Sequence, residues 1–334
     1  MENNILLARL KPEIDSIDEA MRRDLQELAA NNLIAPGLAE VLQHALFNGG
    51  KRFRPLLCVL AAGLCGRRGE DLYRLAIAFE YLHVATLLHD DVIDHAETRR
   101  GRPPVSCLFG LAPAILAGDF LHARSMFLVG TIGGRECLEI LCRATEAMVA
   151  GEFLQLANAE NFNQLEDDYF AVINGKTALF IGAVCECGAI FSRADKEERE
   201  ALQTYGSCLG RAFQIQDDLL DYLGDPARTG KVVGNDFCEG KMTLPLIHAL
   251  NNCNSREKKF LLDLLMGEKE QRCDWLGEAR DIIGAAHGFD YSRRVAQQLT
   301  ATAIGSLDIF SDRGNEEIVA SLAGLAAYVL RRDK

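Results

Sequence analysis

The sequence predicts an all-α protein built as one large helical domain. Leucine and alanine are used heavily, and both favour helices. Only 8 prolines are spread over 334 residues, so few helices are interrupted. No linker rich in proline, glycine and serine divides the chain, and no repeat of about 20–50 residues recurs. We therefore expect a single domain over residues 1–334 with ample apolar sequence for its core.

Apolar residues recur with a helical period in successive segments. Asn48-Gly49-Gly50 is a good end for one helix, and Pro55 suits the first turn of the next. We expect helices over 5–30, 37–48, 53–65, 70–96, 112–131, 135–157, 165–190 and 196–223. After Pro245 the chain is expected to be helical to its end, with breaks near 251–255 and 312–315.

Composition excludes several classes of protein. A net charge of −12 disfavours binding to nucleic acid. The N-terminus lacks the apolar run of a signal peptide, and no apolar run approaches the ~18 residues of a membrane span. The 11 cysteines are scattered without a Cys-x-x-Cys pattern, so we expect reduced thiols and no disulfide. These features indicate a cytoplasmic protein without a transmembrane segment.

An acidic group interrupts the apolar helix expected over residues 70–96. Asp90 and Asp94 are four residues apart, which stacks them about 6 Å apart along one helix face, and Asp91 lies between them. Carboxylates this close repel each other, and a hard divalent ion such as Mg²⁺ would offset the repulsion. Arg99 and Arg100 follow at once, and guanidinium groups bind phosphate bidentately.

A second helix repeats the Asp-Asp-x-x-Asp spacing. Gln214, Asp217, Asp218 and Asp221 form one stripe of the helix expected over 196–223. One such pattern often arises by chance on a solvated acidic face. Two patterns, each embedded in apolar sequence, favour a shared metal site instead.

Cations gather where a helix is expected to begin. Lys51 and Arg54 follow the two glycines, at the helix end whose dipole is already positive. They form either an anion site or a solvated loop, and we favour the anion site. His83 lies two turns before Asp90 on the same face, as a ligand-binding group or as an ordinary core histidine.

Three further lysines are candidates for phosphate binding. Lys176, followed by Thr177, lies in apolar helical sequence, where it needs an anionic partner unless its side chain reaches solvent. Lys231 and Lys241 lie in a glycine-rich stretch after the second acidic helix. This stretch is either a mobile flap over phosphates or an ordinary surface loop.

Placing the two acidic stripes face to face predicts a site for two or three Mg²⁺ ions that share a diphosphate. Such a site stabilises a departing diphosphate electrostatically. The cations near residues 51–54 would hold a second phosphorylated substrate close to the first.

The motifs GGKRFRP (49–55), LLHDDVIDHAETRRGRP (87–103), GKTALF (175–180), FQIQDDLLD (213–221), GKVVGND (230–236) and EGKMTLPL (239–246) occur in this order. On these motifs the chain resembles the trans-isoprenyl diphosphate synthases, the polyprenyl synthetase family. The resemblance implies an isoprenoid-synthase-type helical bundle around a central, mostly apolar cavity. It also implies Mg²⁺-dependent addition of isopentenyl diphosphate to an allylic diphosphate, such as farnesyl or geranyl diphosphate, by a homodimer.

The resemblance also implies roles for individual residues. Those implied to hold metal are Asp90, Asp94, Asp217 and Asp221, with Asp91 and Asp218 as further catalytic carboxylates. Those implied to bind isopentenyl diphosphate are Lys51, Arg54, His83 and Arg100. Those implied to bind the allylic diphosphate are Arg99, Lys176, Thr177, Gln214, Lys231 and Lys241, with Lys176 also catalytic. No evident side-chain base occurs in these motifs, so the departing diphosphate is expected to take the final proton.

Product length depends on the depth of the pocket below the first aspartates. The residues four and five before Asp90 are Thr86 and Ala85, which are small, whereas short-chain members of the family carry bulky aromatics there. We expect the growing chain to pass this level and to end lower, at Leu82, Tyr81 or Phe79, or at Phe127 or Met148 of the next helices. The expected product is longer than C15, of the octaprenyl type used for quinone side chains.

Three alternatives stay open. A synthase of farnesyl or geranylgeranyl diphosphate would differ only in product length. A class I terpene cyclase shares the ionisation chemistry, but it would lack the GGKRFRP site for a second diphosphate. A helical di-metal storage or scaffold protein would carry Glu-x-x-His pairs, which are not prominent here.

Overall fold

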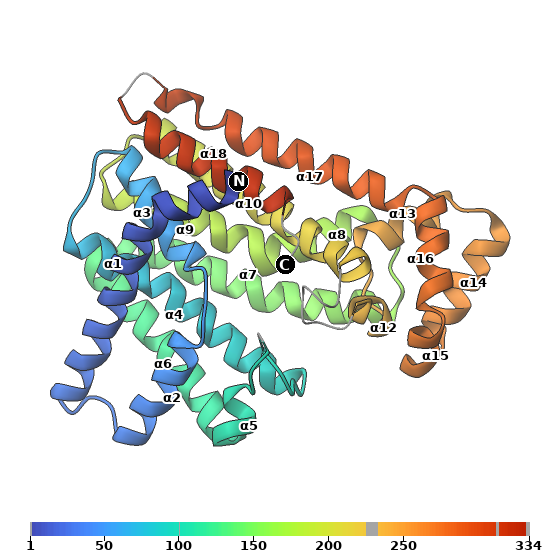
Figure 1. Ribbon diagram of the computed structural model, residues 1–334, viewed down its shortest axis with the longest axis horizontal. Coiled ribbons are helices and arrows are strands. Elements are labelled where there is room, and N and C mark those ends of the chain that lie inside the picture. Colours follow the sequence, from blue (N-terminus) through green and yellow to red (C-terminus); the bar gives the residue numbers. More distant parts are fainter. Residues whose placement is uncertain (1, 100, 225–232, 312–313, 332–334) are drawn as a thin grey trace. The chain divides into compact units, whose positions relative to one another are not determined.

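The computed structural model describes residues 2–99, 101–224, 233–311 and 314–331, and Figure 1 shows its helices. Within these ranges every extended regular element is a helix, and the single β-type pairing is an isolated bridge between Arg99 and Arg102. The prediction of an all-α protein is confirmed.

The elements up to residue 191 are α1 (Glu2–Ala30), α2 (Pro36–Phe47), α3 (Phe53–Leu64), α4 (Glu70–Ile93), α5 (Val105–Phe109), α6 (Leu111–Leu128), η1 (Val129–Gly133), α7 (Gly134–Glu160), α8 (Glu166–Ile173), η2 (Asn174–Ala178) and α9 (Leu179–Phe191). Those that follow are α10 (Lys196–Leu223), α12 (Asn235–Cys238), α13 (Leu244–Asn252), α14 (Ser255–Met266), α15 (Lys269–Asp274), α16 (Leu276–Ala285), α17 (Gly288–Gly305), η3 (Asp308–Phe310) and α18 (Glu316–Leu330).

The chain forms two compact units. Unit 1 comprises Met1–Cys142, Ala183–Gln203 and Phe310–Leu322, and unit 2 comprises Arg143–Gly182, Thr204–Ile309 and Ala323–Lys334. The boundary between them falls within α7, α9, α10, η3 and α18. That residues 1–334 form a single domain stays a prediction.

Unit 1 is organised around α4, which packs most extensively against α6 and also contacts α3 and α1. Its apolar residues occur all round the helix, so most of its length is buried. Near the acidic end of α4, the His89 ring occupies the space beside Gly118 of α6. A Cβ at position 118 would lie 2.3 Å from the His89 Nε2 atom, so glycine is required for this close approach.

Unit 2 has its own core, in which α13 packs against α17, α16, α14 and α8. Helix α10 contributes Ile215, Leu219 and Tyr222 to this core, and all three are buried. The core therefore fixes the orientation of the helix that carries the second acidic stripe.

The helix predicted over 165–190 is interrupted by the π-helical turn η2. Gly151 of α7 and Gly175 of η2 meet there, because a Cβ on Gly175 would lie 3.1 Å from the Gly151 Cα atom. π-Bulges of this kind occur often at functional sites. The helix predicted over 70–96 ends earlier, at Ile93, and the chain after residue 245 has more breaks than the two predicted.

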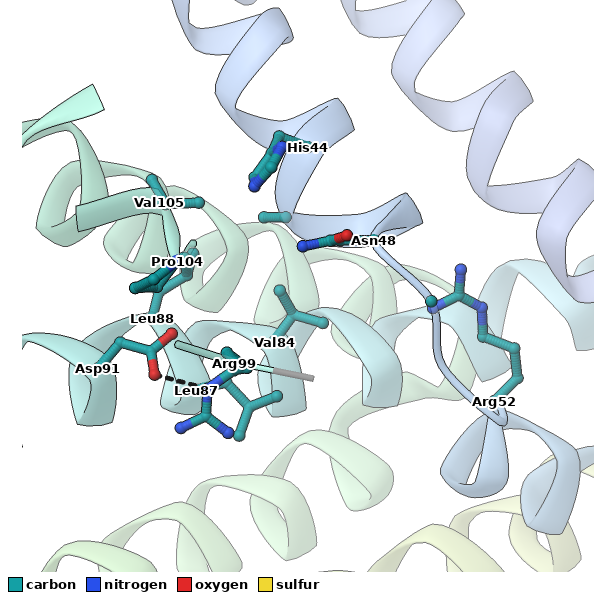
Figure 2. Close-up of a pocket in the computed structure, with 12 residues that line it drawn as sticks. His44, Asn48, Arg52, Val84, Leu87, Leu88, Asp91, Arg99, Pro104 and Val105 are labelled. Carbon is teal, nitrogen blue, oxygen red and sulfur yellow. Dashed lines mark hydrogen bonds and ion pairs between the residues drawn. The ribbon is translucent and has the colours of Figure 1, made fainter. Parts of the chain in front are cut away.

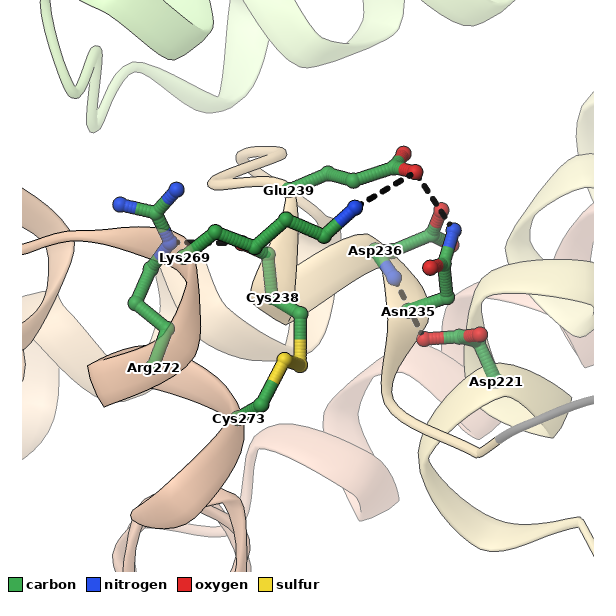
Figure 3. Close-up of a disulfide and its surroundings, with 8 residues drawn as sticks. All are labelled: Asp221, Asn235, Asp236, Cys238, Glu239, Lys269, Arg272 and Cys273. Carbon is green, nitrogen blue, oxygen red and sulfur yellow. Dashed lines mark hydrogen bonds and ion pairs between the residues drawn. A yellow bond between two sulfur atoms is a disulfide. The ribbon is translucent and has the colours of Figure 1, made fainter. Parts of the chain in front are cut away.

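Two short helices that the sequence analysis did not predict are α5 and α12, and α12 packs against α15. A disulfide joins Cys238 of α12 to Cys273 of α15, with Cα atoms 5.1 Å apart (Figure 3). The expectation of reduced thiols is wrong for this pair, because the contact joins residues 35 positions apart and local sequence does not reveal it. The other nine cysteines, all within the described residues, form no disulfide.

Two helical stretches, Leu111–Glu160 and Glu166–Phe191, are long and apolar enough to pass for membrane spans by length and composition. Two such stretches are weak evidence for membrane spans, because buried core helices pass the same test, and the expectation of no transmembrane segment is not overturned. The most apolar window is 33% buried inside the protein in the first stretch and 67% buried in the second.

Candidate active site

The acidic end of α4 is the first part of the candidate site, in unit 1. The Asp94 amide donates a hydrogen bond to the Asp90 carbonyl oxygen at 2.8 Å, so the predicted one-turn spacing of the two residues is present although the helix ends between them. Asp91 is buried and accepts a hydrogen bond from the Arg99 Nε atom at 2.5 Å. Burial raises the pKa of the Asp91 carboxyl, and Arg99 opposes that shift.

A pocket opens beside this pair, between the end of α2 and the acidic end of α4 (Figure 2). His44 lines it from α2 and Asn48 from the cap that follows this helix, and Asp91 and Arg99 line it from the opposite side. The Arg102 Nη1 atom donates to the Asn48 Oδ1 atom at 2.8 Å, which ties the segment after α4 to the end of α2. The pocket therefore contains both a carboxylate and a cation of the sequence prediction.

The GGKRFRP segment borders the same pocket through Gly49 and Arg52. Gly49 has φ +82°, a conformation that favours glycine, and it leads into the exposed Lys51. Arg54 is half-buried in the first turn of α3. The predicted Arg100 lies outside the described residues.

Arg52 connects this segment to the predicted His83 turn. Its Nη1 atom donates to Glu80 Oε1 at 3.1 Å, and Glu80 precedes the half-buried His83 by one turn of α4. The structure thus anchors the cationic segment on the helix that carries His83. That the two form one anion site stays a prediction.

The candidate chain-length residues also lie on α4. Leu82 and Ala85 are 1% and 2% exposed, whereas Thr86 is half-buried and donates a hydrogen bond to the His83 carbonyl at 2.8 Å. Tyr81 and Phe79 are fully buried. Phe127, a candidate for the lower end of the pocket, is 56% exposed, so in this single chain its side chain is largely at the surface.

In unit 2, the π-turn η2 presents Lys176 to α7. The Lys176 Nζ atom lies 2.6 Å from Glu152 Oε2 and 3.2 Å from Gln155 Oε1. The sequence left two possibilities for this lysine, an anionic partner or a side chain that reaches solvent. Glu152 is such a partner, and the Lys176 side chain is also 32% exposed. The partner comes from a different helix, which the local sequence did not indicate.

A hydrogen-bond chain runs from η2 to the second acidic stripe. Thr177 Oγ1 donates to Gln214 Oε1 at 3.1 Å, and Gln214 Nε2 donates to Asp218 Oδ1 at 3.0 Å. The Tyr169 hydroxyl donates to the other Asp218 oxygen at 2.7 Å. The structure therefore brings Thr177, Gln214 and Asp218 together as predicted and adds Tyr169.

The last aspartate of the stripe meets the described part of the glycine-rich stretch, which begins at residue 233 (Figure 3). Asp221 Oδ2 accepts a hydrogen bond from the Asp236 amide at 3.0 Å. The Lys241 Nζ atom lies 3.0 Å from Asp236 Oδ1 and 2.8 Å from Glu239 Oε2. Lys241 thus adjoins the acidic stripe through Asp236, while Lys231 lies outside the described residues.

Negative charge accumulates at this end of α10. Burial, and then the nearby Asp236, raise the pKa of Asp218 to about 8 and that of Asp221 to about 7. Burial lowers the pKa of Lys241, but Asp236 and Glu239 outweigh it and the net shift is upward. A cation is the partner that these carboxylates favour.

The donor set fits Mg²⁺. Its members are carboxylate oxygens, which a hard ion prefers, and their raised pKa values reflect negative charge that nearby side chains only partly offset. Among the described residues, no group of three or more His, Cys, Asp or Glu side chains is placed to hold a metal alone. Mg²⁺ needs no such group, because waters and substrate phosphates complete its coordination.

The two acidic segments belong to different units, Asp90–Asp94 to unit 1 and Asp217–Asp221 to unit 2. That they face each other across one cavity stays a prediction.

Several residues of the two sites were missed by sequence reasoning: His44, Asn48, Arg52, Glu152, Tyr169 and Asp236. Arg52 and Asp236 lie inside motifs already singled out, so position alone would have indicated them. The others come from elements without a distinctive local pattern, and only the fold reveals them.

Comparison with known proteins gives consistent results. The family model of the polyprenyl synthetases matches residues 35–282. The octaprenyl diphosphate synthase of Escherichia coli is 36% identical over 286 residues, covering 86% of this chain and 87% of that protein. A short chain isoprenyl diphosphate synthase of Methanothermobacter thermautotrophicus is 32% identical, covering 97% and 98%.

A crystal structure of polyprenyl synthase from Caulobacter crescentus, complexed with calcium and isoprenyl diphosphate, matches with a TM-score of 0.87 at 33% identity. The match covers 98% of this chain and 97% of that one. The helical fold, with acid-rich helices beside lysine- and arginine-bearing segments, defines an enzyme of the isoprenoid synthase class. Within that class, the chain belongs to the polyprenyl synthetase family.

Proposed function

We propose that the protein is a Mg²⁺-dependent trans-prenyltransferase that adds isopentenyl diphosphate to an allylic diphosphate and repeats the addition to a product longer than C15. The observation that carries the proposal is the same in each unit. In each, an Asp-Asp-x-x-Asp segment lies beside a cationic side chain. In unit 1, Arg99 pairs with Asp91. In unit 2, Lys241 pairs with Asp236, whose amide donates a hydrogen bond to Asp221. Acidic groups for metal and cations for phosphate are what a diphosphate leaving group requires.

In unit 1, the proposed site for isopentenyl diphosphate comprises Lys51, Arg54, His83 and Arg100. Support comes from the anchoring of the GGKRFRP segment on α4 one turn before His83. Arg99 is proposed to exchange part of its contact with Asp91 for an oxygen of the allylic diphosphate, because its guanidinium has further N–H donors.

In unit 2, the proposed allylic site comprises Lys176, Thr177, Gln214, Lys231 and Lys241. Lys176 is proposed to leave Glu152 and Gln155 when a diphosphate, which carries more negative charge, binds. Thr177 and Gln214 position the site through their hydrogen-bond chain to Asp218.

Asp90, Asp94, Asp217 and Asp221 are proposed to hold two or three Mg²⁺ ions, with Asp91 and Asp218 as supporting carboxylates. Bound Mg²⁺ supplies Lewis-acid stabilisation of negative charge on diphosphate. The lysines and arginines of the site stabilise the same charge as the allylic C–O bond breaks. The isopentenyl double bond then attacks the allylic carbocation, and the departing diphosphate takes the proton that is lost.

The proposed product is a long polyprenyl diphosphate of the type used for quinone side chains. The small side chains of Thr86 and Ala85 support this, because neither would block a channel for the growing chain along α4 below the aspartates. Relatives that make long chains and relatives named as short-chain synthases both match the sequence, so product length is the property to measure.

A homodimer and a cytoplasmic location complete the proposal. Five large apolar side chains of α5 and α6 are each at least 42% exposed in the single chain: Leu108, Leu111, Ile115, Leu116 and Phe127. Apolar side chains gathered on one short stretch favour burial against a second copy. Light scattering during gel filtration would test this, and Leu116→Glu is expected to yield monomers.

The test of function incubates the protein with Mg²⁺, farnesyl diphosphate and isopentenyl diphosphate and weighs the products. The expected result is longer prenyl diphosphates with release of inorganic diphosphate, both abolished by EDTA. Asp94→Asn is expected to lower turnover strongly, whereas Asp15→Asn, which alters an exposed aspartate of α1, is expected to leave it unchanged. A cyclic hydrocarbon, or no release of diphosphate from the wild type, would contradict the proposal.

A further inference from the structure

Arg52 lies between Lys51 and Arg54, but it differs from both in its surroundings. Its side chain is 4% exposed, whereas Lys51 is exposed and Arg54 is half-buried. Figure 2 shows the Arg52 guanidinium well apart from the Asp91–Arg99 pair on the other side of the view. The Arg52 side chain is thus buried in the interior of unit 1.

The Arg52 guanidinium binds three different helices of unit 1. Its Nε atom donates to Asp18 of α1 at 2.6 Å, and its Nη1 atom donates to Glu80 of α4 at 3.1 Å. Its Nη2 atom donates to the carbonyl oxygen of Leu46 in α2 at 2.8 Å. Two carboxylates offset its charge, so the buried arginine adds little repulsion to its cationic neighbours.

The backbone at Arg52 explains why this anchoring matters. Arg52 has φ +50° and ψ +39°, a left-handed conformation that non-glycine residues rarely adopt, and it is the N-cap of α3. Such a conformation persists only when the surroundings fix it. The turn at Arg52 sets the direction in which the chain passes from Lys51 into the first turn of α3, where Arg54 lies.

We propose that Arg52 is a positioning residue for the isopentenyl diphosphate site, and that its three-way anchor fixes Lys51 and Arg54 relative to the His83 turn of α4. This inference rests on the proposed function of that site. Arg52 itself makes no contact with substrate in this proposal. Its planar fork of donors is required, because the single ammonium of lysine cannot reach three acceptors in these directions.

The experiment compares Arg52→Lys with the wild type in separate titrations of isopentenyl diphosphate and farnesyl diphosphate. A displacement of about 1 Å in binding groups can cost up to about 100-fold in rate. We expect KM for isopentenyl diphosphate to rise about tenfold or more, with kcat and KM for farnesyl diphosphate within about twofold of the wild type.

Arg124→Lys is the matched control. Arg124 is another largely buried arginine of unit 1; it pairs with the buried Asp24, which also accepts a hydrogen bond from Tyr81 at 3.0 Å. Its replacement should lower the melting temperature without altering KM for isopentenyl diphosphate. An equal rise of that KM in Arg124→Lys would overturn the inference, because the effect would then be a general loosening of unit 1.

Asp18→Asn provides a milder test if Arg52→Lys does not fold. Asp18 is 34% exposed, and its replacement removes one of the three anchors. We expect a smaller rise in KM for isopentenyl diphosphate alone. If Arg52→Lys folds and its KM for isopentenyl diphosphate equals that of the wild type, the positioning role is refuted. If Arg52→Lys does not fold, a wild-type KM for isopentenyl diphosphate in Asp18→Asn refutes it. A wild type that does not elongate farnesyl diphosphate would instead refute the proposed function.

Discussion

Replacing Thr86 by phenylalanine tests whether an open channel runs below the first aspartates. Thr86 lies four residues before Asp90 on α4, so the two share a helix face about 6 Å apart along the axis. Thr86 is half-buried, which is expected of a side chain at the edge of such a channel. A phenyl ring there should block the growing chain, so Thr86→Phe is expected to make a shorter product than the wild type.

The expected cost in stability distinguishes a channel from a packed core. If space lies beside Thr86, the main loss is its hydrogen bond to the His83 carbonyl, about 1 kcal/mol. If the surroundings are packed, overpacking adds about 1–3 kcal/mol. Ala85 is 2% exposed, so Ala85→Phe is expected to shorten the product too, but with this larger loss of stability.

The assay measures product length by mass spectrometry, with Mg²⁺, farnesyl diphosphate and excess isopentenyl diphosphate, and thermal unfolding of each variant. Thr86→Val is the matched control, because it removes the same hydrogen bond without adding bulk. Its product should have wild-type length. If folded Thr86→Phe also made a product of wild-type length, the channel would not pass this face of α4 and the reasoning would be refuted.

Three further predictions concern other parts of the molecule. Under oxidising conditions, Cys273→Ser should lower the free energy of unfolding by about 3–4 kcal/mol, because the bond to Cys238 closes a loop of 35 residues. Lys176→Met should raise KM for farnesyl diphosphate and lower kcat, while KM for isopentenyl diphosphate stays unchanged. Burial raises the pKa of Glu186, so its contribution to stability is present below its ordinary pKa of 4.5 and is lost as the pH rises. The gain in unfolding free energy of Glu186→Gln over the wild type should therefore be larger at about pH 7 than at about pH 4.

Each of these predictions has a control of the same residue type. Cys107→Ser alters an exposed free thiol and leaves the Cys238–Cys273 bond intact, so its stability should fall on addition of reductant as that of the wild type does. Lys196→Met and Glu200→Gln alter an exposed ion pair of α10 and should match the wild type. A pH dependence of unfolding equal in Glu186→Gln and the wild type would show that Glu186 does not titrate as stated.

The parts of the fold that depend on local pattern could be predicted from the sequence. The predicted bounds 196–223 coincide with those of α10, because apolar and acidic residues alternate with a clear helical period there. The same periodicity placed Gln214 and Asp218 on one stripe, and the hydrogen bond between them confirms it. The end of α4 was predicted too late, since the acidic residues before position 96 also suit a helix.

Contacts between residues far apart in sequence could not be predicted. From the sequence, Arg52 is one more cation of a predicted anion site. Only the positions of Asp18 and Glu80 show that its side chain binds neighbouring helices instead. The π-turn η2 is similar, because it depends on two glycines on different helices that allow the backbones to meet. Local sequence specifies which groups are present, whereas the fold specifies which of them already have partners.

The energetics of the second acidic stripe argue that it is kept for function. Burying Asp218 and Asp221 beside Asp236 is unfavourable for their charged forms, which is why the pKa of each carboxyl is raised. Apolar residues at such positions often give an equally stable or more stable fold. The fixed cation nearby, Lys241, is already paired with Asp236 and Glu239, so it offsets only part of the negative charge. A stripe that disfavours its own ionisation gains most from a cation that arrives with the substrate, so under the proposed function metal binding and diphosphate binding are expected to be coupled.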